Sequence, residues 1–470
     1  MLNKEETRKI IDTALSFSKA DACGVSVGQS NQVQTRFARN TVTTGGDHNS
    51  IVVTVSAVKG NRVGRTSSNG FSDDELRKAV RSAEELASFA PPNPEFVAPL
   101  KPQKYPETPS FDAKTAAATQ AAFAPGIKAA IEGATEKKLN AAGFFQREAV
   151  SLAFGTSTGN SGHSDATLAT YTLTARTADG TGSGWASTGS RSLADIDGAA
   201  VSRVAIDKAV LSQKPRDLSR GEYTVVLEPA AVAGFITMIF DAFDARDAEE
   251  GRSLLTKKGG GTLLGEKLFS EKITARSDPF DARNAGLPWD GNILTEIPNI
   301  GGAFFGVGGG AGMVGDFVPA RKLAWIEKGV VKNLAYDRYW GQQKNVEPTP
   351  EAGSNLVIDG EDHSVDDLVK STERGLLITR FWYIRTINPQ TVQVTGLTRD
   401  GVFMIENGKV AYPVRNFRWN ESPARSLQNV EMLSRVERVP GFGGQGLGAL
   451  AVVPGMKIRN FPVSSLSEAV

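Results

Sequence analysis

Residues 221–251 constrain the fold of this 470-residue chain most strongly. They open with residues 223–227, which are β-branched, aromatic or apolar and favour a strand. Pro229 suits the first helical position, because its fixed φ and missing N–H cost nothing there. Apolar residues then recur at steps of three and four, which predicts a helix over residues 229–248 with one apolar face. These residues are Val232, Phe235, Ile236, Ile239 and Phe243.

The start of this predicted helix bears on catalysis. Some zinc peptidases bind their metal from such a helix, with two histidines about one turn apart and a glutamate beside the first. Glu228 is present here, but Leu227 and Val232 occupy the positions of the two ligands. Neither side chain can hold a metal, so the stretch predicts no metal site.

The bulk composition is typical of a soluble protein of roughly two to three domains. Fifty-three basic and 52 acidic residues leave almost no net charge, so nothing demands a nucleic acid or an anionic membrane as partner. The single cysteine, Cys23, excludes an internal disulfide framework. No apolar run approaches the ~20 residues that span a membrane, and the N-terminus lacks the hydrophobic core of a signal peptide. We therefore expect a cytoplasmic protein.

The pattern of elements predicts two domains that meet near residue 215. Residues 1–215 mix helices and strands without β-α-β alternation, which is typical of an α+β domain. Within them, residues 89–110 hold seven prolines and predict a linker or an extended arm. Residues 216–470 form mostly strands and loops, with a hairpin at Asn407-Gly408. The predicted fold is thus α+β, with a β-rich C-terminal domain built around one strand–helix unit.

Three segments carry a resemblance to one protein family. Residues 221–251, 264–279 and 379–420 are similar to the TldD/PmbA family of proposed peptidases, once called modulators of DNA gyrase. In the metal-bearing branch of that family the motif is His-Glu-x-x-x-His, completed by a cysteine near the C-terminus. The motif maps onto Leu227, Glu228 and Val232, and residues 440–455 hold no cysteine. The chain therefore resembles the metal-free TldE/PmbA branch.

The resemblance implies a function in company with another protein. It implies a non-catalytic subunit without metal or cofactor, which pairs with a TldD-like metallopeptidase to process unfolded or ribosomally made peptides. An extended peptide would bind by adding a strand to a sheet edge, a mode that tolerates varied sequences. Two alternatives stay open. One is a self-sufficient hydrolase whose site, such as a Ser-His-Asp triad, is assembled by the fold; the other is a homodimeric peptide-binding protein.

Three charged side chains are candidate substrate contacts. Glu228 precedes the predicted helix, where its carboxylate would cap the first turn or contact a substrate or partner. Arg380 and Arg385 flank the aromatic residues 381–384. They would clamp a peptide carboxylate or an acid at an interface, or they would keep an edge strand soluble.

Several short motifs predict turns, strands or loops rather than sites. The three histidines of the chain lack a second ligand at metal spacing. Gly-x-Ser-x-Gly occurs around Ser26 and Ser157, but without the strand–turn–helix context of a nucleophile elbow. Residues 28–31 and residues 161–165 predict turns. Residues 310–315 and 441–446 match a dinucleotide fingerprint by letter only and are interpreted as loops.

Overall fold

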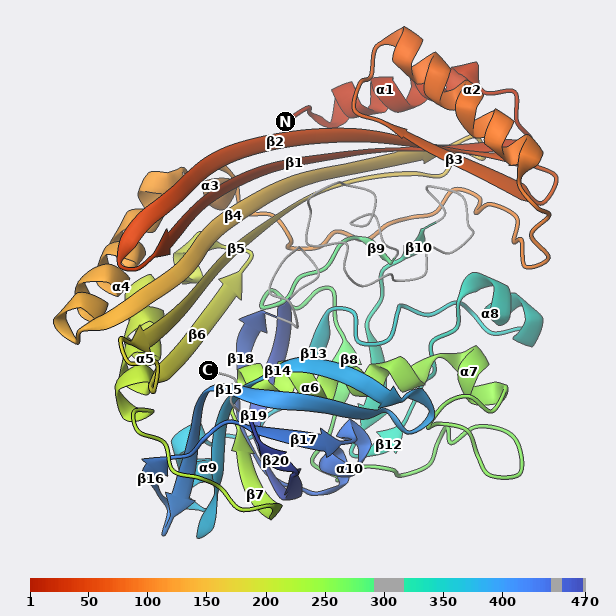
Figure 1. Ribbon diagram of the computed structural model, residues 1–470. Coiled ribbons are helices and arrows are strands. Elements are labelled where there is room, and N and C mark those ends of the chain that lie inside the picture. The colour runs from red at the N-terminus through yellow and green to blue at the C-terminus, as the bar shows by residue number, and fades with distance from the viewer. Residues whose placement is uncertain (291–316, 441–449, 468–470) are drawn as a thin grey trace.

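The computed structural model describes residues 1–290, 317–440 and 450–467 of the chain. The glycine-rich residues 310–315 and 441–446 lie outside these ranges. The described residues form two large β-sheets flanked by helices, which is the α+β class that the sequence predicts (Figure 1).

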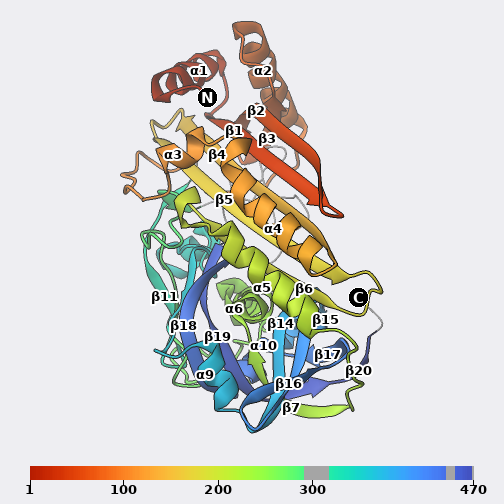
Figure 2. The same cartoon turned by 90° about the vertical axis from the view of Figure 1, so that its left-hand side faces the viewer.

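The N-terminal part of the chain builds a curved antiparallel sheet in the order β3-β2-β1-β4-β5-β6. Its strands are β1 (Ala22–Ala38), β2 (Thr41–Lys59), β3 (Arg62–Ser68), β4 (Leu139–Thr156), β5 (Ser161–Thr177) and β6 (Ser183–Ser190). Four helices cover its convex face: α1 (Lys4–Phe17), α2 (Asp73–Phe89), α4 (Ala124–Glu136) and α5 (Gly198–Leu211). Alternate strand residues pack beneath them in two apolar clusters, one under α1 and α2 and one under α4 and α5. The ribbon views show these helices along the convex side of the sheet (Figures 1 and 2).

Strand β1 corrects one prediction from the sequence. It runs without interruption through residues 28–31, where a turn is predicted. Gly28 pairs with Val52 of β2 and with Leu152 of β4, so strands on both sides hold the backbone extended. Tertiary pairing thus overrides the turn preference of glycine and asparagine. The turn predicted at residues 161–165 is also wrong, because Ser161 begins β5.

The proline-rich segment runs as an extended arm. It leads from α2 to the short helices α3 (Ala113–Ala117) and η1 (Gln120–Phe123), and residues 91–110 contain no helix or strand. Tyr105 fixes the arm, because its hydroxyl donates to the carbonyl oxygen of Phe317 at 2.8 Å. Its ring packs edge-on against Phe154 of β4 and against Trp289.

The C-terminal part builds a twelve-stranded sheet in the order β12-β11-β8-β13-β19-β7-β14-β15-β17-β20, with β16 beside β15 and β18 beside β19. Its strands are β7 (Gly221–Leu227), β8 (Ala275–Ser277), β11 (Leu323–Glu327), β12 (Val330–Val331), β13 (Leu356–Ile358), β14 (Arg374–Asn388), β15 (Gln393–Glu406), β16 (Lys409–Pro413), β17 (Phe417–Glu421), β18 (Val430–Pro440), β19 (Leu450–Val463) and β20 (Ser465–Leu466). Other short elements lie outside the two large sheets. They are η2 (Leu193–Asp195), α8 (Arg338–Lys344), α9 (Val365–Lys370), η5 (Pro389–Thr391), α10 (Pro423–Gln428) and the small pair β9 (Trp289–Asp290) and β10 (Val318–Pro319). The predicted hairpin at Asn407-Gly408 is confirmed between β15 and β16, and both turn residues have positive φ.

The predicted helix over residues 229–248 consists of three shorter pieces. They are α6 (Pro229–Phe235), the 3₁₀ helix η3 (Ile236–Phe243) and α7 (Ala245–Glu249). Asp244 leaves helical geometry at φ −58° and ψ 123°, and its carboxylate caps α7 by accepting from the backbone N–H of Asp247 at 2.8 Å. The amide of Ala245 donates instead to the carbonyl oxygen of Ala335 at 2.9 Å, which ends the preceding helix.

The apolar face predicted for this segment is nevertheless buried. All five apolar residues that define it lie in the main apolar cluster of the C-terminal part, against the inner face of the twelve-stranded sheet. Phe235 packs edge-on against Phe381 of β14 and Trp419 of β17. The strand–helix unit therefore sits in the core of this half, with β7 at the middle of the sheet. None of the described helices is long and apolar enough to cross a membrane.

Candidate functional site

The candidate site lies where β7 ends, next to the place where the two sheets meet. β7 is parallel to β14 and antiparallel to β19, so its last residue, Leu227, pairs with Ile378 and Met456. Above this end, α5 and β6 of the N-terminal sheet contact β15 and β18 (Figure 2). We call this region the junction.

A metal does not fit at the two motif positions. Leu227 and Val232 are both 0% exposed and pack within the apolar cluster, and hydrocarbon offers no lone pair to an ion. Cys23, the only cysteine of the sequence, is buried in β1 of the other sheet. Among the described residues, no group of three or more His, Cys, Asp or Glu side chains is placed to hold a metal.

Glu228 does not cap its helix, contrary to the prediction. It occupies the N-cap position of α6, but its side chain makes no capping hydrogen bond. Its carboxylate instead forms an ion pair with Lys208 of α5, with 2.5 Å between Oε2 and Nζ. The two side chains are only 18% and 15% exposed. The Glu228 carboxylate thus pairs with the full positive charge of Lys208 and not with the partial charges on the N–H groups of the first turn of α6. This ion pair joins α5 to the end of β7.

A second carboxyl group lies beside this ion pair. Glu437 of β18 is exposed as a residue, but the surrounding protein still partly desolvates its carboxyl group. This desolvation and the nearby Glu228 carboxylate raise the pKa of Glu437, while Lys208 acts in the opposite direction. The next residue, Arg438, forms an ion pair with Asp195 at 2.6 Å and donates to Ser190 of β6 at 2.9 Å. Charged contacts therefore link β18 to the N-terminal sheet.

Arg380 lies at the same junction, with its side chain 15% exposed. Its guanidinium forms an ion pair with Asp400 of β15, which is fully buried and accepts a hydrogen bond from Ser183 of β6. Burial lowers the pKa of Arg380, and the Asp400 carboxylate opposes that change. The guanidinium lies over the rings of Trp185 and Trp382, at 4.3 and 5.2 Å from their centroids. Arg380 therefore belongs to an ion pair inside the protein and is not a solvated charge on a strand edge.

Arg385 lies apart from the other two predicted contacts. Its side chain is exposed on the outer surface of β14, where it donates to the carbonyl oxygen of Ile384 at 2.8 Å. The guanidinium lies over the ring of Tyr383 at 4.2 Å. The structure thus brings Glu228 and Arg380 to the junction and leaves Arg385 on the surface.

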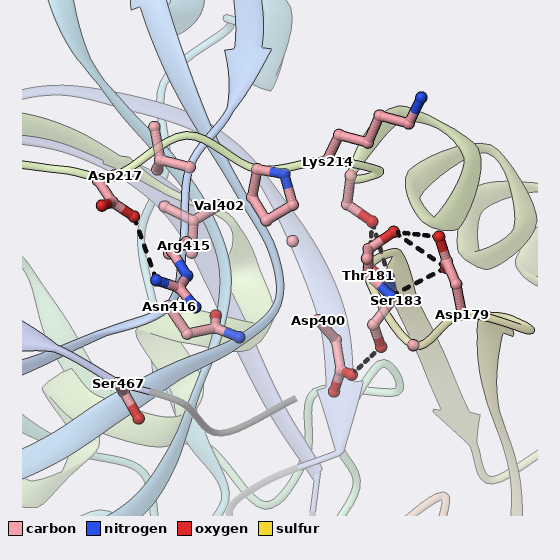
Figure 3. Close-up of a pocket in the computed structure, with 15 residues that line it drawn as sticks. Asp179, Thr181, Ser183, Lys214, Asp217, Asp400, Val402, Arg415, Asn416 and Ser467 are labelled. Carbon is pink, nitrogen blue, oxygen red and sulfur yellow. Dashed lines mark hydrogen bonds and ion pairs between the residues drawn. The ribbon is translucent and has the colours of Figure 1, made fainter.

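A cavity of about 610 Å³ opens beside the junction (Figure 3). Its walls come from the β5–β6 turn, the connection after α5, and residues of β15 and the β16–β17 loop. Asp400 and Ser183 meet at one side of it, and Asp217 and Arg415 form an ion pair at 3.3 Å on the other (Figure 3). Its volume suits a small molecule, but Glu228, Arg380 and Arg385 are not among the residues that line it.

A serine, a histidine and an aspartate do come together on β4 and β5, but not as a triad. Ser151 Oγ lies 3.2 Å from His163 Nε2, and Asp165 Oδ1 lies 3.8 Å from the same nitrogen. A triad uses the two ring nitrogens for two different partners. This group therefore gives no support to a hydrolase that acts alone. Ser26 lies within β1 and Ser157 in the turn after β4, as the sequence predicts.

Sequence reasoning missed Lys208, Asp400 and Glu437. Lys208 and Glu437 belong to ordinary amphipathic segments, and only the fold brings them to Glu228. Asp400 carried a weak signal, because an Asp-Gly pair, which favours a turn, stands in the middle of a segment that is predicted to form strands. Its φ of 57° and the φ of 128° at Gly401 show the bulge behind that signal.

Comparison with known proteins identifies the family. The sequence model of the PmbA/TldA metallopeptidase C-terminal domain matches residues 220–465, and that of PmbA/TldA metallopeptidase domain 1 matches residues 23–87. The chain belongs to the PmbA/TldD family.

Individual PmbA/TldD relatives are distant in sequence. A metalloprotease of Archaeoglobus fulgidus is 23% identical over 236 residues, and this match spans 48% of each chain, or about half the length of that curated relative. The crystal structure of TldE from Thermococcus kodakarensis aligns with 97% of this chain and 99% of its own, at 19% identity and a TM-score of 0.79. A Thermotoga maritima protein described as a modulator of a DNA gyrase aligns over 97% and 100%, at 15% identity and 0.79. The whole fold is thus shared with these structures.

Proposed function

We propose that this chain is the metal-free subunit of a two-subunit peptidase. It would pair with a TldD-like metallopeptidase in processing unfolded or ribosomally made peptides. The observation that carries the proposal is the burial of Leu227 and Val232, two hydrocarbon side chains, where the family motif has its metal ligands. Glu228 is held by Lys208 instead of facing a metal-bound water. Peptide hydrolysis then needs catalytic groups from a second polypeptide.

An open strand edge supports the binding of extended peptides. β3 pairs with β2 only over residues 53–59, so among the described residues no strand covers residues 41–52 on that side. This segment is polar and mostly exposed, and it contains no lysine, arginine or proline that would hinder pairing. A peptide added there would use backbone hydrogen bonds and accept varied sequences.

Several sequence predictions belong to the same proposal. A peptide-contacting role for Glu228, Arg380 and Arg385 stays a prediction, and so do the domain boundary near residue 215 and the cytoplasmic address. Because Glu228 and Arg380 each already hold an oppositely charged partner, a peptide would meet them only as members of an ion pair. Arg385 is the exposed member of the three.

A reconstitution assay tests the proposal. The purified chain, a purified family member that carries His-Glu-x-x-x-His, and an equimolar mixture are each incubated with an unfolded, fluorogenic peptide. We expect no cleavage by this chain alone, and faster cleavage by the mixture than by the metal-bearing member alone. Replacing both histidines of that member with alanine serves as the control and should abolish all cleavage. Cleavage by this chain alone at the rate of the mixture would contradict the proposal.

A further inference from the structure

The outer surface of the C-terminal sheet displays aromatic and apolar side chains at the far end of β14. Trp382, Tyr383 and Ile387 are 42%, 59% and 50% exposed, whereas the adjacent Phe381 and Ile384 are buried in the core. Large exposed apolar side chains that cluster in this way mark interaction surfaces more often than isolated ones do. We call these three residues, together with Arg385 and the exposed Arg418 of β17, which lies on the other side of β15, the hairpin face.

The backbone is distorted at this point, and the distortion exposes both aromatic rings. In a regular strand, successive side chains point to opposite faces, so one of Trp382 and Tyr383 would point into the core. A bulge in the pairing of β14 with β15 falls between Trp382 and Arg385. Tyr383 there has a φ of +54°, a left-handed conformation that is an outlier for a bulky residue. Such strain is retained mainly where a function requires it.

Arginine side chains hold both rings in place. Arg380 and Arg399 lie over Trp382 at 5.2 and 4.8 Å from its centroid, and Arg385 lies over Tyr383 at 4.2 Å. Exposed tryptophan, tyrosine and arginine are the residues most enriched at binding hot spots. Rings that are already ordered also lose less conformational entropy on association. The hairpin face is therefore prepared for a protein partner.

The charges on the hairpin face favour a different chain over a second copy. Strands β14, β15 and β17 contain three carboxylates: Asp400 and Glu421, which are buried, and Glu406, at the opposite end of the β14–β15 pair beside Arg374. Glu421 already forms an ion pair with Arg425. Arg385 and Arg418 have no ion-pair partner in the part of the chain that the structure describes. A two-fold contact would place this face against itself, so arginines would meet arginines without an acid between them. A partner with carboxylates would satisfy both charges.

We propose that the hairpin face docks the metal-bearing subunit through an acidic surface with apolar recesses for Trp382 and Tyr383. This inference rests on the proposed function and adds the surface that performs it.

The test measures binding of the full chain to a purified His-Glu-x-x-x-His family member from the same organism, by isothermal titration calorimetry. Tyr383→Gly removes the ring and suits the left-handed backbone, and Arg385→Glu reverses a charge. We expect each variant to bind on the order of 30-fold more weakly, as for hot-spot residues. Two exposed residues of α2 give matched controls, because Phe89→Ala and Arg81→Glu make similar changes elsewhere. They should bind within about twofold of wild type.

The other possible results would refute either the docking face or the two-subunit function. Wild-type binding that neither variant weakens would refute the docking face and leave the two-subunit function standing. No binding by the wild-type chain would refute both. Analytical ultracentrifugation of this chain alone covers the remaining case. A dimer of the wild type that Arg385→Glu dissociates would assign the face to a second copy and overturn the inference.

Discussion

Replacing Lys208 with methionine tests the ion pair that joins α5 to the end of β7. Methionine keeps a flexible side chain of similar length, so the change removes the ammonium group with little loss of packing. It leaves Glu228 without its cation and beside Glu437, whose pKa that carboxylate already raises. The junction would then hold two carboxylates without the lysine between them.

The expected cost follows from how deeply the pair is buried. Removing one partner of a fully buried ion pair costs about 3–5 kcal/mol, because the other charge is left uncompensated. Lys208 and Glu228 are 15% and 18% exposed, so water screens part of the remaining charge. We therefore expect Lys208→Met to lower the free energy of unfolding by about 2–3 kcal/mol at pH 7. An exposed ion pair would cost no more than about 1 kcal/mol.

Urea denaturation of four proteins provides the measurement: wild type, Lys208→Met, Glu228→Gln and the double variant. Because the double variant leaves no uncompensated charge, it should be more stable than Lys208→Met alone. The coupling energy between the two changes should be at least about 1 kcal/mol. Glu437→Gln in the Lys208→Met background should also recover stability. A cost below about 0.5 kcal/mol, or additive single effects, would refute the claim that this pair holds the junction together.

Three further predictions concern other buried or strained residues. Burial raises the pKa of Glu148 to about 7, so wild type should lose about 3 kcal/mol of stability as the pH rises from about 4.5 to 8. Denaturation of Glu148→Gln across that range should lack this loss. Asp400→Asn keeps a residue that tolerates the left-handed backbone but leaves Arg380 without its carboxylate, which should cost about 3–5 kcal/mol in urea denaturation. Tyr383→Gly should leave the free energy of unfolding unchanged or raise it by up to about 1 kcal/mol, because glycine adopts the positive φ without strain.

The results that would contradict these three predictions differ. For Glu148, the variant would show the same pH dependence as wild type. For Asp400, the asparagine variant would unfold at the wild-type urea concentration. For Tyr383, the glycine variant would lose about 2 kcal/mol or more, which would mean that the ring stabilises the fold instead of being displayed for a partner.

Local pattern predicted the central unit well in composition and less well in shape. The apolar spacing of Val232, Phe235 and Phe243 identified a buried face, because burial selects side chains whatever the type of helix. It did not reveal the break at Asp244, which depends on a hydrogen bond from Ala245 to Ala335, about 90 residues away. The turn predicted at residues 28–31 failed for the same reason, since neighbouring strands hold β1 straight there.

In the candidate site, too, properties of single residues could be predicted from the sequence, whereas contacts between distant segments could not. The sequence alone shows that positions 227 and 232 carry no metal ligand, because leucine and valine have hydrocarbon side chains in any fold. The true partner of Glu228 could not be predicted, because Lys208 reaches it only through the packing of α5 on the junction. The exposed rings of Trp382 and Tyr383 were equally hidden, since two successive aromatic residues in a strand predict one inward and one outward ring.

The metal content of the purified chain shows whether Leu227 and Val232 have replaced a metal site. The purified chain and a His-Glu-x-x-x-His family member are incubated with excess Zn²⁺ or Fe²⁺, freed of loosely bound ions by gel filtration, and analysed by mass spectrometry. We expect about one equivalent in the control protein and less than about a tenth of an equivalent in this chain, because Leu227 and Val232 offer no lone pair to an ion. Retention of about one equivalent by this chain, lost on Glu228→Ala substitution, would contradict it.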